Sequence, residues 1–455
     1  MDISCFKAYD IRGHVPKELD ADLAWRIGRA YVEEIQPVKV VVGYDARLES
    51  PMLAQALITG LMEAGAEVID IGLCGTEEVY FHTFHRQSQG VNGGIMITAS
   101  HNPKGYNGMK LVREGARPVS SDSGLLGIRE RVAAYPATLP PTPLSGRCMQ
   151  DYDKTPYIEH LLSYIDRPSL KPLKIVADPG HGTAGPILRQ LAKHLPFEFI
   201  FIRDQPDGHF PDGAPNPLLP AMRTVTARAV LAHHADLGLA WDGDFDRCFF
   251  FDHTGRFIEG YYLVGLLAEI MLTKHPGGTI IHDPRLIWNT IEQVRKAGGH
   301  PLQNKTGHAF IKERMRQEKA IYGGEMSSHH YFRDFAYCDS GMLPWLLVTE
   351  LISKTATSLA ELVDARMQAY PCSGELNYTV HDVTAVMERV LDYYASLHPA
   401  IDRTDGLSLE FSTWRFNLRA SNTEPLLRLN IETRGDAAAL AHHIAELEKL
   451  IQGSA

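Results

Sequence analysis

The decisive stretch of this chain leads from an apolar run into a polar loop: Ile95-Met96-Ile97-Thr98-Ala99-Ser100-His101-Asn102-Pro103. The apolar residues indicate a buried β-strand that ends near Thr98. Asn102-Pro103 and the glycines at 105 and 108 exclude a smooth helix directly after that strand. We therefore predict a tight loop that displays Ser100 at a strand end, which is where open α/β sheets carry their active sites.

Apolar runs and helical periods alternate through most of the chain. The predicted strands cover residues 38–43, 66–71, 93–98, 173–177, 197–202, 236–241, 279–282 and 319–322, and the predicted helices cover 51–64, 183–194, 262–272 and 309–317. This alternation indicates mainly parallel sheets covered by helices. The proline-rich segment 136–143 predicts a first linker.

The pattern changes after Pro371. Strands are predicted at 376–380, 407–411, 414–418 and 426–431, and a closing helix at 437–450. This order is typical of a smaller α+β domain.

Composition excludes several classes of protein. A chain of 455 residues is too long for one core. Its net charge of -10, without a basic stripe, argues against a nucleic-acid partner. No apolar run approaches the roughly 18 to 20 residues that span a bilayer, and the first residues lack the charged segment of a signal peptide. We therefore expect a cytoplasmic protein without a membrane partner.

The six cysteines are scattered and form no Cys-x-x-Cys pair. This spacing disfavours a zinc site or a disulfide framework. We expect buried thiols.

Three carboxylates follow the apolar run 237–241 at alternate positions: Asp242, Asp244 and Asp246. Such residues share a face of an extended chain, and Gly243 allows a turn that wraps all three around one hard cation. Oxygen-only ligation suits magnesium. An EF-hand is disfavoured, because Arg247 occupies the position of the loop glycine and no glutamate closes the loop. A solvated acidic turn is the alternative.

Two further loops carry polar residues suited to a phosphorylated sugar. Glu325, Ser327 and His329 follow the apolar run 320–322, and such side chains can recognise sugar hydroxyls, although a glycine-rich turn explains them equally well. The segment 419–428 offers arginine, hydroxyl and amide groups that make a nest for a phosphate dianion. An ordinary β-turn is the alternative there.

These four segments, in this order, closely resemble motifs of the α-D-phosphohexomutases, the phosphomannomutase/phosphoglucomutase family, and they span nearly the whole chain. The resemblance implies an α/β fold of three similar mixed α/β domains plus a smaller C-terminal α+β domain around a central cleft. The expected domains are 1–145 with a phosphoserine loop, 146–252 with a magnesium loop, 253–368 with a sugar-recognition loop and 369–455 with a phosphate-binding loop.

The resemblance also implies a role for individual residues. Catalytic roles fall to Ser100, which carries the phosphate, and to Arg12, His101, Lys110 and Arg247, with Lys110 or His329 as the general base. Magnesium ligands would be Ser100, Asp242, Asp244 and Asp246. Substrate contacts would come from Arg285, His308, Glu325, Ser327, His329, Arg419, Ser421, Asn422, Thr423 and Arg428. Residues 178–184 match a motif of structural character, in which we expect Thr183 to cap a helix.

The implied activity is that of an isomerase that interconverts mannose 6-phosphate and mannose 1-phosphate through a hexose 1,6-bisphosphate, which also serves as activator, with Mg²⁺ as cofactor. The product would supply GDP-mannose for surface polysaccharide. Glucose phosphates are an alternative substrate, because Ser328 replaces the glycine expected in the best-matching dual-specificity loops. We expect a monomer or weak dimer with a mobile C-terminal domain.

Two rival functions come from other classes. A phosphatase with an aspartate nucleophile would use Asp242 and Asp244 after the apolar strand, but it leaves the serine loop unexplained. A non-catalytic phosphosugar sensor would tolerate loss of Ser100 or of the aspartates, whereas every catalytic position of the family is present here.

Overall fold

A computed structural model describes residues 2–140, 142–420 and 426–453. The chain divides into two compact units. Unit 1 comprises Met1–Phe257 and His329–Ala356, and unit 2 comprises Ile258–Ser328 and Thr357–Ala455.

The first sheet of unit 1 contains the strand that precedes Ser100. Its strand order is β1-β5-β4-β2-β3-β7, with β6 paired to β5. The strands are β1 (Ile11–His14), β2 (Lys39–Tyr44), β3 (Glu67–Leu73), β4 (Val91–Ile97), β5 (Tyr106–Arg113), β6 (Arg117–Pro118) and β7 (Cys148–Gln150). β2, β3, β4 and β7 are parallel, and β5 runs antiparallel to β4 and β1. The predicted parallel core is therefore present, with an antiparallel edge.

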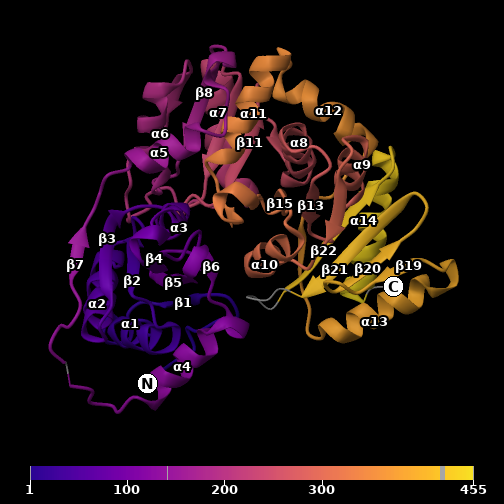
Figure 1. The fold of residues 1–455 in the computed structure, drawn as a ribbon. Helices are drawn as coiled ribbons and strands as arrows, with labels where there is room; N and C mark the ends of the chain where they lie inside the picture. Colours follow the sequence, from indigo (N-terminus) through magenta and orange to yellow (C-terminus); the bar gives the residue numbers. More distant parts are fainter. Residues whose placement is uncertain (1, 141, 421–425, 454–455) are drawn as a thin grey trace. The chain divides into compact units, whose positions relative to one another are not determined.

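Helices cover both faces of this sheet, as Figure 1 shows. They are α1 (Ala21–Ile35), α2 (Ser50–Glu63), α3 (Thr76–His85) and α4 (Leu125–Ala134). Val40 and Val42 of β2 pack in one core with α1, α2 and α4, whereas Val41 packs in another core with Val79 of α3. Alternate residues of a buried strand face opposite sides, which explains why the interior of β2, residues 40–43, has no polar side chain.

The second sheet of unit 1 positions the three aspartates. Its order is β12-β11-β10-β8-β9. The strands are β8 (Lys174–Asp178), β9 (Glu198–Phe201), β10 (Leu237–Trp241), β11 (Cys248–Asp252) and β12 (Phe257–Ile258), and the accompanying helices are α5 (Thr155–Leu162), α6 (Ala184–Leu191) and α7 (Pro220–His233). β8, β9 and β10 are parallel, whereas β11 returns antiparallel to β10. The connection from β10 to β11 is therefore a hairpin loop at the end of a buried strand.

The later segment of unit 1 forms an antiparallel pair, β16 (His330–Phe332) with β17 (Cys338–Asp339), followed by helix α11 (Leu343–Thr355). It carries the last histidines of the predicted sugar loop.

Unit 2 begins with parallel strands in the order β14-β13-β15. They are β13 (Thr279–His282), β14 (His300–Gln303) and β15 (Tyr322–Gly324), accompanied by α8 (Gly260–Lys274), α9 (Trp288–Lys296), α10 (His308–Glu318) and α12 (Leu359–Ala369). The strand predicted at 319–322 begins only at Tyr322, because α10 continues to Glu318 and Lys319 ends it in a left-handed conformation with φ 51°.

The last sheet of unit 2 is antiparallel, in the order β18-β22-β21-β20-β19. The strands are β18 (Leu376–Thr379), β19 (Ala400–Asp402), β20 (Leu407–Glu410), β21 (Trp414–Ala420) and β22 (Leu426–Thr433), and the helices are α13 (Val383–Tyr394) and α14 (Ala437–Gln452). Both helices share one hydrophobic core with the strands. The α+β character predicted after Pro371 is confirmed.

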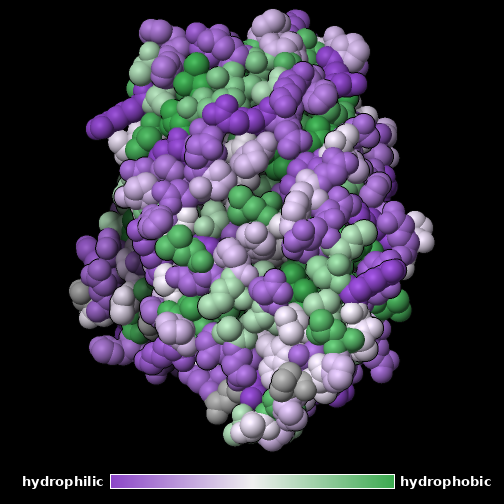
Figure 2. Space-filling model, turned by 90° about the vertical axis from the view of Figure 1, so that its left-hand side faces the viewer, coloured by the Kyte–Doolittle hydropathy of each residue, from purple (hydrophilic) through white to green (hydrophobic). Residues whose placement is uncertain are grey.

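On the face drawn in Figure 2, hydrophobic residues lie in separate groups among hydrophilic ones. Cys148 is exposed, so the prediction of buried thiols is wrong for this residue, whose strand β7 has exposed side chains throughout. Within the described part of the chain, no helix is long and apolar enough to cross a membrane.

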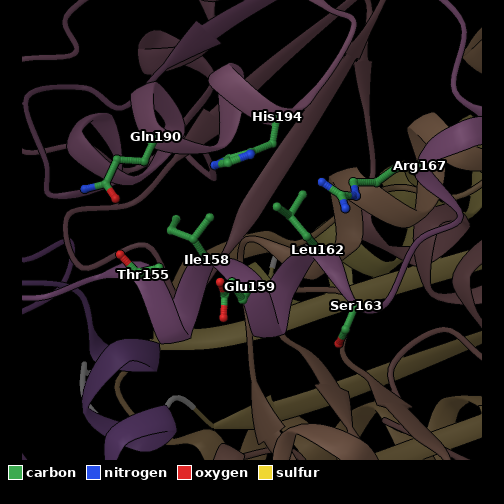
Figure 3. A pocket seen from close by; sticks show the side chains of 8 residues that line it. All are labelled: Thr155, Ile158, Glu159, Leu162, Ser163, Arg167, Gln190 and His194. Atoms are coloured by element: carbon green, nitrogen blue, oxygen red, sulfur yellow. The ribbon is translucent and has the colours of Figure 1, made fainter.

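A surface pocket of about 460 Å³ lies between α5 and the end of α6. Figure 3 shows Ile158 and Leu162 of α5 facing Gln190 and His194 across it. Its lining contains none of the residues that the sequence predicts for the site.

Candidate active site

Ser100 lies just after β4, in the segment that leads to β5. Its φ of 50° is left-handed, a conformation that costs a residue other than glycine about 1 kcal/mol or more. The backbone N–H of Ser100 donates to the Thr98 hydroxyl at 2.8 Å, and only 4% of the serine is exposed. The predicted tight loop at a strand end is confirmed, and the local strain marks this serine as functionally constrained.

Arg47, which the sequence analysis did not select, holds this loop in place. Its Nη2 donates to the carbonyls of Ser100 at 2.9 Å and Asn102 at 2.6 Å. Its Nη1 donates to the carbonyls of Pro103 and Tyr106, each at 3.0 Å. One buried guanidinium therefore connects four points of the serine loop.

Asp45 fixes Arg47 in turn. Nε of Arg47 lies 3.3 Å from Asp45 Oδ2, and the hydroxyls of Ser50 and Thr98 donate to the same carboxylate at 2.6 and 2.7 Å. A signal was available in the sequence, because Asp45 and Arg47 directly follow the strand β2.

Asp242, Asp244 and Asp246 occupy the loop between β10 and β11, and all three are buried. One carboxylate oxygen of each lies within 4.8 Å of the others. Ser100 Oγ donates to Asp242 Oδ2 at 2.9 Å. Oδ1 of Asp244 is buried and accepts no hydrogen bond from the described residues. This set of oxygen ligands fits a hard divalent cation such as Mg²⁺.

Gly243 permits the approach of the aspartate loop to the serine loop. A Cβ at this position would lie 2.5 Å from the Ser100 carbonyl oxygen. The turn predicted at Gly243 is present: the Phe245 N–H donates to the Asp242 carbonyl at 3.1 Å and closes a turn around Gly243 and Asp244. The left-handed φ of the loop lies at Phe245, at 45°, so glycine is required at position 243 for close approach rather than for its φ. Thr183 precedes α6 as predicted, but its hydroxyl donates to the Gly243 carbonyl at 3.2 Å and makes no cap bond to the helix.

Two cationic side chains compensate the buried aspartates. Lys110 Nζ lies 2.7 Å from Asp244 Oδ2 and 2.5 Å from Asp246 Oδ2. Arg247 donates to Asp242 Oδ2 through Nε at 2.9 Å and Nη2 at 2.7 Å. Burial alone would lower the pKa of Lys110, but the two aspartates raise it above its ordinary value. Lys110 is therefore charged in this arrangement.

His101 lies between the serine and Arg247. Its Nδ1 is 3.1 Å from Ser100 Oγ and 2.5 Å from Arg247 Nη2. Burial, followed by the charges of Arg247 and Arg12, lowers the pKa of His101 well below its ordinary value. The imidazole is therefore neutral and can accept a hydrogen bond from Arg247.

Arg12 lies against the same loop. Its Nη1 donates to the Ala99 carbonyl at 2.6 Å and to Asn102 Oδ1 at 2.8 Å, and its Nη2 pairs with Asp10 at 2.5 Å. The structure thus brings together all the catalytic and metal-binding residues that the sequence predicts in unit 1.

His329 also belongs to unit 1. Its ring, Asp246 and Asp339 of β17 each offer a ligand atom within 4.8 Å of the others. The imidazole therefore lies beside the aspartate loop. His330, to which the sequence assigned no role, is buried, and burial lowers its pKa to about 3.

The start of α3 supplies two more residues that sequence reasoning missed. The Thr76 hydroxyl donates to the Asp244 carboxylate at 2.5 Å, and the Thr76 N–H donates to the Asp244 backbone carbonyl at 3.0 Å. The next residue, Glu77, accepts hydrogen bonds from Ser340 Oγ at 2.8 Å and from the Gly341 N–H at 2.5 Å. Both side chains look like ordinary first-turn residues of a helix, so the sequence offered no signal for these long-range contacts.

Unit 2 holds the other predicted residues. Arg285 follows β13 and pairs with Asp283 at 2.7 Å, and Asp283 also accepts the Met326 N–H at 2.8 Å. Arg285 Nη2 lies 3.4 Å from Ser327 Oγ and 3.9 Å from Glu325 Oε1. Asp283 therefore ties the arginine to the polar loop after β15.

Glu325 connects this loop to α10. Its carboxylate accepts the N–H of Gly307 at 3.0 Å, and His308 is the first residue of the helix. Ser328 has a left-handed φ of 68°, the conformation that glycine adopts most easily. Serine therefore replaces the expected glycine at a position where the backbone is constrained.

Arg419 and Arg428 lie on neighbouring strands β21 and β22 and are direct partners in the strand register. Arg285, Arg419 and Arg428 each approach the carboxylate of Glu375 at 3.4 Å. Three arginines that the sequence predicts for substrate binding are thus gathered in unit 2. Ser421, Asn422 and Thr423 lie outside the described residues.

Models of the phosphoglucomutase/phosphomannomutase family match this chain four times, as α/β/α domain I at residues 4–137, domain II at 155–255, domain III at 259–370 and the C-terminal domain at 380–450. The chain belongs to the phosphoglucomutase/phosphomannomutase family. The family and the fold class predicted from the motifs are therefore confirmed.

Individual relatives match over all or nearly all of their length. Phosphohexose mutases of Xanthomonas campestris pv. campestris (strain ATCC 33913) are 61% identical over 453 residues, which cover 100% of both chains. Phosphomannomutase of Salmonella typhimurium (strain LT2) is 58% identical over 441 residues, covering 95% of this chain and 96% of its own. The solved structure of a phosphoglucomutase/phosphomannomutase family protein from Burkholderia thailandensis has a TM-score of 0.88 and 33% identity, covering 100% of this chain and 98% of that one.

Proposed function

We propose that this protein is a phosphomannomutase, an isomerase that interconverts mannose 6-phosphate and mannose 1-phosphate. The observation that carries the proposal is the 2.9 Å contact between the Ser100 hydroxyl and Asp242, beside two further buried carboxylates. The full-length similarity to phosphohexose mutases and to phosphomannomutase supports a mutase reaction.

In the proposed reaction, phosphorylated Ser100 transfers its phosphoryl group to the free hydroxyl of a hexose monophosphate. The Ser100 Oγ–P bond breaks as the sugar O–P bond forms, which gives a hexose 1,6-bisphosphate. The bisphosphate then turns, and Ser100 recovers the phosphoryl group from the other end. The proton of the sugar hydroxyl passes to a base. Lys110 is charged in this arrangement, so His329 is the residue we assign to accept that proton.

The cations around Ser100 stabilise the charge of the phosphoryl group. Arg247 and the neutral His101 lie beside the serine hydroxyl, and Arg12 lies on the same loop. Mg²⁺ held by the three aspartates and a phosphoryl oxygen of Ser100 would withdraw charge from the group in transfer.

In this proposal, residues of unit 2 bind the sugar and the phosphate that does not react. Glu325 and Ser327 contact sugar hydroxyls, and Arg285 and His308 contact the substrate. Arg419 and Arg428, together with Ser421, Asn422 and Thr423, hold the phosphate that does not react. A hexose 1,6-bisphosphate activator, supply of GDP-mannose, a cytoplasmic location and a monomer or weak dimer stay predictions of the same proposal.

Phosphorus NMR tests the proposal. Mannose 1-phosphate is incubated with the protein, Mg²⁺ and a trace of hexose 1,6-bisphosphate, and the experiment is repeated with glucose 1-phosphate to rank the sugars. Conversion of mannose 1-phosphate to the 6-phosphate without free phosphate is expected. Release of inorganic phosphate would favour the phosphatase, and an unchanged spectrum would favour the sensor. Faster conversion of glucose 1-phosphate would make the protein a phosphoglucomutase.

A further inference from the structure

Glu375 is the carboxylate at which three arginines of unit 2 meet. Its Oε2 lies 3.4 Å from Arg285 Nη1 and 3.4 Å from Arg419 Nη2, and its Oε1 lies 3.4 Å from Arg428 Nη1. The Glu375 side chain is 25% exposed, whereas that of Arg285 is only 4% exposed. The carboxylate is therefore partly accessible to solvent, whereas the Arg285 side chain is buried.

The backbone fixes Glu375 at this place. Gly374 has a φ of 66°, and its carbonyl accepts a hydrogen bond from Asn430 Nδ2 at 2.8 Å. The N–H of Ser373 donates to the Ile431 carbonyl at 2.9 Å, and the N–H of Ile431 donates to Ser373 Oγ at 2.9 Å. These bonds attach the segment before β18 to β22, so the position of Glu375 relative to Arg428 is determined by the sheet.

The sheet also forces like charges together. Arg419 and Arg428 are direct partners on β21 and β22, which run side by side in the sheet at the yellow end of the chain in Figure 1. Like charges directly opposite each other destabilise an antiparallel pair. Burial first, and then the charge of Arg285, lower the pKa of Arg419, and Glu375 acts in the opposite direction. The arginines therefore need an anion between them.

Asp283 and Glu375 contact the arginines at different distances. Asp283 binds Arg285 at 2.7 Å and also accepts the N–H groups of Arg285 and Met326 at 3.0 and 2.8 Å, so it is fully engaged. The contacts of Glu375 are all 3.4 Å, longer than the roughly 2.7 to 2.9 Å of a strong charge-assisted hydrogen bond. Burial alone would raise the pKa of Glu375. The three arginines together outweigh burial and bring the pKa below its ordinary value, so this carboxylate is ionised.

We infer that Glu375 is a positioning residue that acts as a resident substitute for the substrate phosphate: it holds Arg285, Arg419 and Arg428 together when no phosphate is present and weakens phosphate binding enough to permit release. This inference rests on the proposed function of the arginines as the phosphate-binding site. Long, loose contacts to three guanidiniums are what such a substitute requires, because an incoming dianion must displace them.

The proposed reaction explains why weaker binding is useful. The bisphosphate must release one phosphate from the arginines and present the other before Ser100 recovers its phosphoryl group. A negative charge close to the arginines repels the bound phosphate and stabilises the cluster after the phosphate leaves. Glu375 therefore favours release, at the expense of affinity.

The test separates binding from turnover. Mannose 1-phosphate is titrated by calorimetry into the Ser100→Ala variant, which cannot carry the phosphoryl group, with and without Glu375→Gln. Glutamine keeps the shape and removes the charge, so the dissociation constant is expected to fall about tenfold, a change of about 1.4 kcal/mol. With Ser100 intact, Glu375→Gln should lower both KM and kcat for mannose 1-phosphate, because phosphate release becomes slower.

Two further variants serve as controls. Glu375→Asp keeps the charge and should keep the dissociation constant near that of Ser100→Ala alone. Glu388→Gln removes one charge from an exposed position of α13 and should change neither the dissociation constant nor KM. A purely structural role of Glu375 would weaken binding and raise KM.

The outcomes distinguish the two proposals. If the wild type converts mannose 1-phosphate but Glu375→Gln leaves binding unchanged or weaker, the inference about Glu375 is overturned and the proposed function stands. If the wild type converts neither mannose 1-phosphate nor glucose 1-phosphate, the proposed function is overturned and the inference with it.

Discussion

At the scale of single residues, the arrangement of Ser100 depends on one buried arginine. Arg47 donates four hydrogen bonds to backbone carbonyls of the serine loop, at distances of 2.6 to 3.0 Å. Burial lowers the pKa of Arg47, and Asp45 counteracts that effect. The strained φ of Ser100 can persist only because such contacts over-determine the loop.

Arg47→Lys is therefore expected to lower kcat for mannose 1-phosphate by about 100-fold, because displacement of a reacting group by about 1 Å costs roughly that factor. Lysine keeps the charge, but its single ammonium cannot reproduce the planar fork that reaches four carbonyls. Steady-state kinetics measure the effect. Arg189→Lys, at a side chain that is 50% exposed, is the matched control and should leave kcat unchanged. An active Arg47→Lys enzyme would contradict the role given to the guanidinium.

The sequence predicted the reactive residues better than the residues that hold them. Ser100 and the three aspartates occur in short local patterns with chemical meaning, and the structure brings them together. Their catalytic and metal-binding roles stay predictions. The partners of Arg47 and Glu375 are distant in sequence. For Arg47 the one local signal was its place just after the end of β2, whereas a lone glutamate such as Glu375 carries no local signal of its contacts.

At the scale of elements, the loop between β10 and β11 and the loop after β4 touch where Gly243 lacks a side chain. Gly243→Ala would place a Cβ 2.5 Å from the Ser100 carbonyl oxygen, a distance that requires one backbone to move. We expect kcat to fall by about 100-fold or more as the serine and the aspartates separate. Kinetics together with thermal unfolding check this prediction.

Gly435→Ala is the control for the glycine substitution. Gly435 has a φ of 69°, and no atom of the described residues lies within 4 Å of the place that a Cβ would take. Alanine there causes backbone strain of about 1 kcal/mol without a clash. Its turnover should match that of the wild type. Equal kcat values for both alanine variants would show that close approach at Gly243 is unimportant.

Helix α3 is attached to the segment before α11 through Glu77, whose buried carboxylate gives stability a pH dependence. Burial raises the pKa of Glu77 to about 8 from an ordinary value of 4.5, although Tyr157, Ser340 and two backbone N–H groups oppose the rise. The folded state therefore keeps a proton that the unfolded state releases. Stability contributed by this group is present at low pH and is lost as pH rises towards about 8.

Glu77→Gln removes this titration. We compare the free energy of unfolding of the wild type with that of Glu77→Gln. The difference, wild type minus variant, should decrease between about pH 5 and pH 8 by up to about 1.4 kcal/mol per pH unit. Above about pH 8 the difference should be constant. Urea unfolding of both proteins across this range measures the difference. A difference independent of pH would mean that Glu77 is ionised throughout.

The predicted bounds of an element match the observed ones where an apolar run and a strand cover the same residues. The strand at 279–282 was predicted at its observed bounds, whereas β15 begins later than predicted. Ala320 and Ile321 are apolar and read as the beginning of a strand, but Lys319 before them still belongs to the end of α10. β6 and β7 are too short, with two and three residues, to leave a periodic signal.

At the scale of the whole molecule, four motif segments predicted four domains, and four family models match the chain in that order. The predicted domain boundaries stay predictions. The two compact units divide the predicted sugar loop between Ser328 and His329. Local patterns cannot reveal such a division, because it depends on which distant segments pack against each residue.

This division makes a last prediction about magnesium. All three aspartates and Ser100 lie in unit 1, and the arginines around Glu375 lie in unit 2. A ligand stabilises only the state that binds it, by about 2.7 kcal/mol when its concentration is about 100 times its dissociation constant. Mg²⁺ should therefore slow amide hydrogen exchange in residues 98–110 and 242–247, while residues 283–287 and 415–419 exchange as before.

Asp242→Asn should abolish that protection, because it replaces a charged ligand and leaves Lys110 and Arg247 to neutralise two carboxylates. Asp122→Asn, which changes the same charge at an exposed residue, should retain it. Hydrogen exchange followed by mass spectrometry compares the three proteins with and without Mg²⁺. Protection that persists in Asp242→Asn would place the cation elsewhere, and protection confined to unit 2 would contradict a metal site at the aspartates.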